Sequence, residues 1–248
     1  MIRSSHYLAL VINAAEEFLL NTTEVKRYPK SNDHQKHYVY YYTDSTTCKR
    51  HAHQDNSPKG QTLAKVYALR AATKNKLKQY RVMWDTLYAF PCPKLNLPKL
   101  RKSRQAFITR ELFDSLVPES NPREVDKSNP YNGINFRSKS EREIAEYLDE
   151  LGIAYKYEPR LRIMNTDIYP DFVCFIPELG IGFIIEHFGM MDSPKYLEHA
   201  NKVIQSYLNC GFLPGIDILF TYERSNYPPR ANYFESQINR MLDSLCAP

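Results

Sequence analysis

Two acidic residues stand at the ends of neighbouring apolar runs. Asp171 follows a proline and opens the apolar run 172–176, and Glu186 closes a second apolar run fifteen residues later. Because side chains alternate along a strand, Asp171 would share a face with Val173, and Glu186 would share a face with Ile184. Adjacent strands lie about 4.8 Å apart, so two carboxylates placed side by side would repel each other unless a cation lay between them.

Oxygen ligands of this kind select Mg²⁺ or Mn²⁺. Such an ion can activate water and bind the phosphate oxygens of an in-line displacement. The alternative for each acid is an ordinary strand-end side chain that faces solvent. The order and spacing of the acids, together with a third one upstream, favour the metal-site hypothesis.

The third acid is Glu141, on the apolar stripe of a predicted helix. It lies three and seven residues before Ile144 and Leu148, so it shares their face at the first turn. Core packing does not call for a carboxylate there. The alternative is a first-turn acid that interacts favourably with the helix dipole. We therefore expect Glu141 either to join the metal site or to stabilise the helix start.

The elements that would position these acids form an α/β pattern. A helix begins after Ser138 or Ser140, which are capping residues, and stops at Gly152. Another helix starts near Ser193, and a final one runs from about Ala231. Strands are expected at 153–157, 160–164, 171–176, 181–187 and 216–221. This order predicts a mixed central sheet flanked by helices.

The first half of the chain has a different pattern. A helix is expected over 5–21, a strand of a hairpin over 37–43 and a long helix over 61–88. Residues 118–135 are rich in Pro, Asn and Ser. We therefore expect two domains, a mainly helical N-terminal region over 1–130 and an α/β domain over 131–248.

Charge is distributed unevenly between these halves. Residues 26–110 hold 19 basic and four acidic side chains, whereas residues 131–248 hold 11 basic and 16 acidic ones. A basic arm beside an acidic core suggests contact with a nucleic acid. The alternative is a solvated face of a lysine-rich helix. The tyrosines of the strand 37–43 could stack on bases or pack against the long helix.

Composition excludes several other classes of protein. The chain has 248 residues, with 43% hydrophobic and 25% charged residues, as in globular domains. No apolar run approaches the roughly 20 residues that span a bilayer, and the N-terminal patch is followed by Glu16 and Glu17, which predicts a helix instead of a signal peptide. The five scattered cysteines fit a cytoplasmic protein without a disulfide framework.

The stretches RSKSEREIAEYLDELGIAYKYEPRL, YPDFVCF, IIEHFGMMDSPKY and ILFTYE resemble the PD-(D/E)xK nuclease superfamily. They look like an uncharacterised subgroup from bacteria and their mobile elements, and the resemblance covers about 137–225. It implies a restriction-endonuclease-like core and a Mg²⁺-dependent endonuclease that acts on DNA in preference to RNA. A setting in phage defence or mobile-element biology follows by analogy only.

The resemblance also implies roles for single residues. Asp171 and Glu186 would bind the metal, with the carbonyl of His187 as a candidate third ligand, and Glu141 would bind or orient through water. Glu158 also matches the subgroup and could orient a nearby basic residue. The superfamily usually has a lysine two residues after the glutamate, where this chain has Phe188.

That lysine stabilises the attacking water or the charge that develops on the phosphate. Lys202, or else Lys195, could supply this charge from the following helix, although an exposed helix lysine is often only solvated. His187 could act as base or phosphate contact if the strand end turned inward, although an ideal strand directs it away from Glu186. The resemblance therefore predicts the catalytic set Glu141, Asp171, Glu186, His187 and Lys202.

Other interpretations stay open at this point. Cys48, His51 and His53, with His34 and His37 upstream, could bind zinc, although zinc sites usually have two paired clusters. The missing lysine allows a nucleic-acid-binding module that has lost cleavage. The arm could also dock a partner protein in a larger complex. Cleavage of both strands by such a core often needs a homodimer, for which the sequence has no signal.

Overall fold

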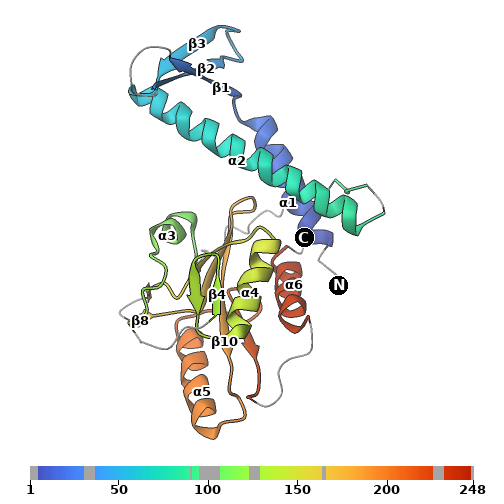
Figure 1. Ribbon diagram of the computed structural model, residues 1–248, viewed down its shortest axis with the longest axis vertical. Coiled ribbons are helices and arrows are strands. Elements are labelled where there is room, and N and C mark those ends of the chain that lie inside the picture. The colour runs from blue at the N-terminus through green and yellow to red at the C-terminus, as the bar shows by residue number, and fades with distance from the viewer. Residues whose placement is uncertain are drawn as a thin grey trace. The chain divides into compact units, whose positions relative to one another are not determined.

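The computed structural model describes residues 5–30, 37–89, 91–94, 107–122, 129–163, 166–225 and 232–246. These residues form a mixed α/β protein with six helices and several small sheets (Figure 1). The chain divides into two compact units. The N-terminal unit is Leu8–Leu97, and the C-terminal unit joins Met1–Tyr7 to Pro98–Pro248. Among the described residues, no helix is long and apolar enough to cross a membrane.

The N-terminal unit consists of two helices and one antiparallel sheet. Its elements are α1 (Ser5–Asn21, in this unit from Leu8), β1 (Val25–Lys30), β2 (His37–Thr43), β3 (Arg50–Gln54) and α2 (Pro58–Leu87). The strands are ordered β1-β2-β3. Ser57 caps α2, because its hydroxyl accepts the Gly60 N–H and a proline fills the first helical position. The expected strand 37–43 is confirmed, and α2 begins three residues before the expected start.

Arg70 of α2 ties the two helices of this unit together. Its guanidinium is buried and donates to the carbonyls of Leu19 and Thr22 at the end of α1, at 2.9 and 2.6 Å. The last carbonyls of a helix lack partners within the helix, and they carry its negative dipole end. Arg70 therefore stabilises the fold instead of offering its charge to a ligand.

A four-stranded mixed sheet is the centre of the C-terminal unit. Its strand order is β11-β10-β9-β6, with β10 and β11 parallel and the other pairs antiparallel. The elements are α4 (Lys139–Glu150), β6 (Ala154–Tyr157), β9 (Phe172–Ile176), β10 (Ile181–Phe188), α5 (Pro194–Asn209), β11 (Ile218–Tyr222) and α6 (Tyr233–Cys246). The predicted order of helix, strands, helix and strand is confirmed at this level.

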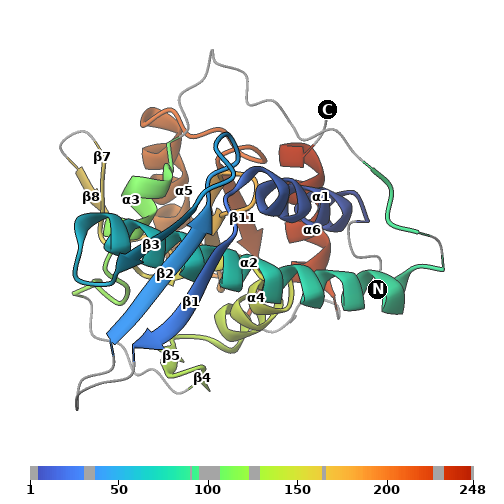
Figure 2. The ribbon, with the colours of Figure 1, turned by 90° about the horizontal axis from the view of Figure 1, so that it is seen from above.

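Helices cover both faces of this sheet (Figure 2). One face is covered by α3 (Arg110–Ser115) and α5. Phe113 of α3 and Tyr207 of α5 pack in the same buried cluster as Val173, Phe175 and Ile184 of the sheet. On the other face lie α4 and α6, which are joined to each other by hydrogen bonds between Tyr147 and Asn239. The two sheet faces are thus distinct environments, and the alternation of each strand decides which side chains enter each one.

Two hairpins differ from the sequence-based expectation. The expected strand 160–164 is β7 (Leu161–Ile163), which pairs with β8 (Thr166–Ile168) in a separate sheet and does not join the central one. The stretch predicted as a domain boundary ends in a hairpin of β4 (Asn129–Tyr131) and β5 (Ile134–Phe136). Its turn is Asn132-Gly133, both with positive φ, which is the sequence signal of a two-residue hairpin.

The division between the units also falls earlier than the expected boundary at 130/131. Ile108, Phe113 and Leu116 are buried in the core of the C-terminal unit. Ile108 lies against Gly182 of β10, where an added Cβ would come within 2.6 Å of it. Residues before 130 therefore complete the core of the C-terminal unit. The Asn132-Gly133 turn of the Pro- and Asn-rich stretch belongs to the C-terminal unit.

Candidate acidic site at the strand ends

The structure brings Asp171 and Glu186 together. Ile185 pairs with Phe172 in the antiparallel register of β10 and β9, so the next opposed residues are Glu186 and Asp171. The Asp171 N–H donates to Glu186 Oε2 at 3.3 Å, and the His187 N–H donates to Asp171 Oδ2 at 2.6 Å. The two carboxyl groups are thus held side by side, on the sheet face that α5 covers.

Both carboxyl groups are crowded by protein and by like charge. Burial, followed by the charges of Glu186 and Glu141, holds the pKa of Asp171 well above its usual range. Burial raises the pKa of Glu186 to about 7, against the lowering effect of its hydrogen bonds. Glu141 and Glu158 add negative charge near both groups. The site is therefore an acidic cluster whose ionised form would be stabilised by a cation.

Two tyrosines of α5 belong to this site and were not predicted. The buried Tyr207 hydroxyl donates to Glu186 Oε2 at 2.9 Å. Tyr196 accepts the Gly189 N–H at 3.3 Å, and the charges of Asp171 and Glu186 contribute to raising the pKa of its hydroxyl, after burial. The signal available was the helical stripe formed by residues 196, 200, 203 and 207, which predicts one face turned to the sheet.

Glu141 lies near the pair, but its side chain is engaged at the start of α4. The Ser138 hydroxyl accepts the Glu141 N–H at 3.1 Å, and Glu141 Oε2 accepts from the Arg137 N–H and the Tyr157 hydroxyl. This resembles a capping box, in which Ser and Glu satisfy each other's backbone groups at a helix start. The structure thus places Glu141 at the helix start, where its charge also raises the pKa of Asp171, and its role at a metal site stays a prediction.

Glu158 is buried next to the cluster and pairs with a basic residue. Its Oε1 lies 2.5 Å from Arg137 Nε and accepts from Asn121 at 3.1 Å. The Glu158 N–H donates to the Asp171 carbonyl at 2.9 Å, and its φ of 44° lies in the left-handed region. Glu158 thus connects Arg137 to the strand that carries Asp171.

His187 points to the opposite sheet face, as an ideal strand predicts. Its Nδ1 lies 3.0 Å from the Thr221 hydroxyl, and its ring meets Phe234 of α6 edge-on. Nε2 lies 3.8 Å from a carboxylate oxygen of Glu223. Its side chain therefore belongs to a polar cluster between the sheet and α6, and only its backbone N–H reaches the acidic pair.

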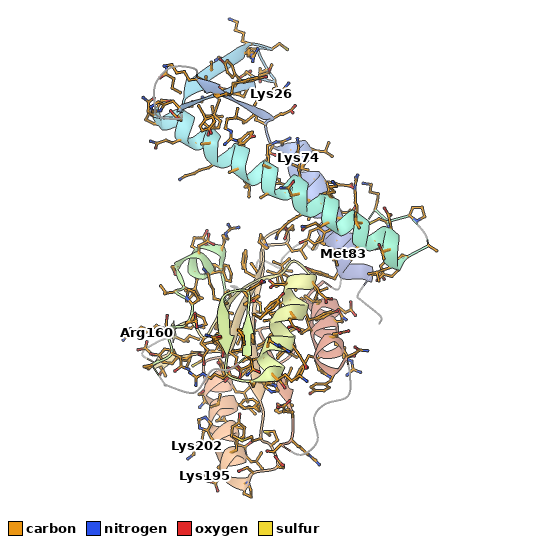
Figure 3. The ribbon with its side chains drawn as sticks, in the orientation of Figure 1. Lys26, Lys74, Met83, Arg160, Lys195 and Lys202 are labelled. Carbon is orange, nitrogen blue, oxygen red and sulfur yellow. The ribbon has the colours of Figure 1, made fainter. Side chains whose placement is uncertain are left out.

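The two lysines expected near the acidic pair, Lys195 and Lys202, both lie in solvent. Phe188 is 2% exposed and stacks on Tyr222 with ring centroids 5.7 Å apart. Lys195 and Lys202 are exposed on α5 (Figure 3). Lys202 lies five residues before Tyr207, so it points about 140° around the helix from the side chain that contacts Glu186. An aromatic cluster therefore occupies the place of the usual lysine.

The carboxyl pair has the ligand chemistry that a hard cation requires. Within the described ranges, Asp171 Oδ1 and Glu186 Oε1 make no hydrogen bond. Among the same residues, no group of three or more His, Cys, Asp or Glu side chains could hold a metal ion. In the zinc hypothesis, His51 and His53 stack on Tyr42 instead, and His34 lies outside the described residues. Asp171 and Glu186 therefore fit a cation that takes its other ligands from water or substrate.

Comparisons of the chain with protein-family models, with curated proteins and with solved structures returned no match.

Proposed function

We propose that the protein is a metal-dependent nuclease that hydrolyses phosphodiester bonds, in DNA in preference to RNA. The observation that carries this proposal is the Asp171–Glu186 pair, two crowded carboxyl groups with raised pKa values on adjacent strand ends. Support also comes from the order α4-β6-β9-β10-α5-β11, which is the element order expected for a restriction-endonuclease-like core.

In this proposal, Asp171 and Glu186 hold Mg²⁺ or Mn²⁺ through the carboxylate oxygens that make no hydrogen bond within the described residues. The ion would supply an activated water and neutralise charge on the phosphate. The chain's own contribution is orientation, because the His187 N–H fixes Asp171 and the Tyr207 hydroxyl fixes Glu186. Glu141 adds negative charge near this pair, which strengthens the attraction for a cation.

Basic side chains of the N-terminal unit would supply affinity for the phosphate backbone. Some of its basic side chains already have partners within the protein. Arg70 caps α1, and Arg81 and Lys94 each pair with Glu16. Others are exposed along the strands and α2: Lys26, Lys30, Arg50, Lys59, Lys65, Lys74 and Lys78. Binding through such contacts weakens steeply with added salt.

A second candidate function is a nucleic-acid-binding module that does not cleave. Phe188 favours it, because a buried aromatic cluster fills the place where the superfamily usually has a catalytic lysine. Lys195 and Lys202 are both exposed on α5 and do not replace that charge near the pair. In this function the acidic pair binds a cation and orders the site without fast hydrolysis.

Cleavage assays distinguish the two functions. The wild-type protein is incubated with plasmid and with single-stranded DNA and RNA, with Mg²⁺ or Mn²⁺ and with a chelator. The nuclease predicts metal-dependent cleavage that Asp171→Asn and Glu186→Gln abolish and that Glu198→Gln retains, since Glu198 is exposed on α5. Intact substrates with every protein, together with salt-sensitive binding, would support the binding module.

The remaining alternative is that the protein is an interaction subunit of a larger complex, and the same protein preparations test this alternative. Such a subunit would show no affinity for nucleic acid at low salt and would co-purify with another chain. Titration calorimetry with Mn²⁺ adds a readout that does not depend on turnover. Glu186→Gln should abolish the Mn²⁺ heat signal, whereas Glu198→Gln should keep it.

A further inference from the structure

The tyrosines of β2 are divided between the two faces of the N-terminal sheet. Tyr40 packs with Val25 and Leu63, and Tyr38 and Tyr42 lie against the same cluster on α2. Tyr41 stands between Tyr40 and Tyr42 and therefore faces the other way. Packing against α2 and stacking on bases are therefore roles for different tyrosines of this strand.

The face away from α2 follows from the strand register. Lys26 pairs with Tyr41, and Tyr41 pairs with Ala52, so these three share that face. The complete outer face, as we call it, consists of Lys26, Tyr28, Lys30, His37, Val39, Tyr41, Thr43, Arg50, Ala52 and Gln54. Among the described residues of this unit, no helix packs on the outer face, and Figure 2 shows the strands lying across α2.

Aromatic rings and cations alternate on the outer face. Tyr28 is 47% exposed and meets Tyr41 edge-on, with ring centroids 5.5 Å apart. The Arg50 guanidinium lies 4.4 Å from the centre of the Tyr41 ring. Lys26 and Lys30 are exposed on the β1 edge, about 13 Å apart along the strand. The strand residues of this face include no Asp or Glu.

This chemistry fits one class of ligand. Phosphates would meet the cations on the β1 and β3 edges, which lie about 10 Å apart, and bases would meet the tyrosines between them. A tyrosine ring can stack only on a base whose face is free, so paired bases inside a duplex do not satisfy this surface. We infer that the outer face binds single-stranded nucleic acid, with Tyr28 and Tyr41 stacking on bases and Lys26, Lys30 and Arg50 contacting phosphates.

The inference deepens the proposed function and rests on its nucleic-acid substrate, but it places binding on different residues from cleavage. Fluorescence anisotropy of the full-length protein, with a chelator present, measures binding of a labelled DNA strand of about 16 nucleotides. The same sequence as RNA and as duplex DNA forms the comparison arms. We expect the single strands to bind more tightly than the duplex at equal salt.

Substitutions separate stacking from charge. Tyr28→Leu with Tyr41→Leu should weaken single-strand binding by roughly 30-fold or more, whereas Tyr28→Phe should retain it, because stacking needs the ring and not the hydroxyl. Lys26→Gln, Lys30→Gln and Arg50→Gln together should make the negative slope of log affinity against log salt shallower by about 2. The control variant Arg162→Gln with Arg224→Gln and Arg240→Gln, which removes three exposed charges from the C-terminal unit, should leave affinity and slope unchanged. Thermal melting verifies that each variant is folded.

Unchanged affinity in both the leucine and the glutamine variants would overturn the inference, as would a preference for duplex. Asp171→Asn distinguishes the two failures. If it keeps single-strand binding while no protein cleaves DNA, the outer-face inference stands and the nuclease proposal falls. If cleavage depends on Asp171 while the tyrosine and cation variants bind normally, the nuclease proposal stands and the outer-face inference falls.

Discussion

Replacing Glu186 by glutamine should change how stability depends on pH. In the folded protein without metal, the pKa of Glu186 is raised from 4.5 to about 7. A raised carboxyl pKa means that the folded state binds more protons than the unfolded state between these values. The wild-type protein should therefore lose stability as pH rises from about 4.5 to about 7. At 1.36 kcal/mol per unit, the loss is about 3 kcal/mol.

Glu186→Gln removes the ionisation and keeps the shape. The glutamine oxygen can still accept from Tyr207 and from the Asp171 N–H. We expect the variant to match the wild type near pH 4 and to exceed its free energy of unfolding by up to about 3 kcal/mol near pH 8. Urea unfolding with a chelator measures this difference, and Glu198→Gln should follow the wild-type curve.

Adding Mg²⁺ or Mn²⁺ at 100 times the dissociation constant should remove most of this difference in stability near pH 8. A ligand that binds only the folded state stabilises it by about 2.7 kcal/mol at 100 times its dissociation constant. The wild-type protein should gain this stability, and Glu186→Gln should not. If both proteins have the same pH dependence, burial and neighbouring negative charge do not raise the pKa of Glu186, and the physical basis of the metal site is refuted.

Three further predictions concern single side chains. Arg70→Met should cost about 1–3 kcal/mol in urea unfolding, because it leaves carbonyls at the end of α1 without a donor, whereas the exposed Lys74→Met should cost almost nothing. Phe188→Lys should cost about 3 kcal/mol or more, because it removes the ring that stacks on Tyr222 and buries a cation, and Phe188→Leu should cost less. Lys202→Gln should leave any cleavage rate within about twofold of wild type, since an exposed charge is screened. A loss of more than tenfold would show that Lys202 takes part in the reaction.

Local patterns predicted most of the element order. Apolar runs of strand length, the proline at the first position of α5 and the capping serine of α4 all act over a few residues, and the structure has those elements. The hairpin at 129–136 was missed although its Asn132-Gly133 turn is a strong signal. A Pro-rich stretch can contain turns within a domain as readily as it can separate two domains.

The separate sheet of β7 and β8 and the place of the unit boundary depended on contacts distant in sequence. Leu161 and Phe113 are buried in the same core, although 48 positions separate them in the chain. No local periodicity records such a pairing. Their positions follow from which apolar surfaces meet when the whole sheet is covered.

By itself, the sequence determined that Asp171 and Glu186 would stand on one face of adjacent strands. Side chains alternate along any strand because of its backbone geometry. The pairing register of β9 and β10 then brings the two strand ends together. The tertiary structure alone decided what surrounds them. Tyr207 contacts Glu186 from 21 residues away, and Phe188 is enclosed in an aromatic cluster. Helix packing sets the angle at which each side chain meets the sheet, and that angle brings Tyr207 to the acids while Lys202 stays in solvent.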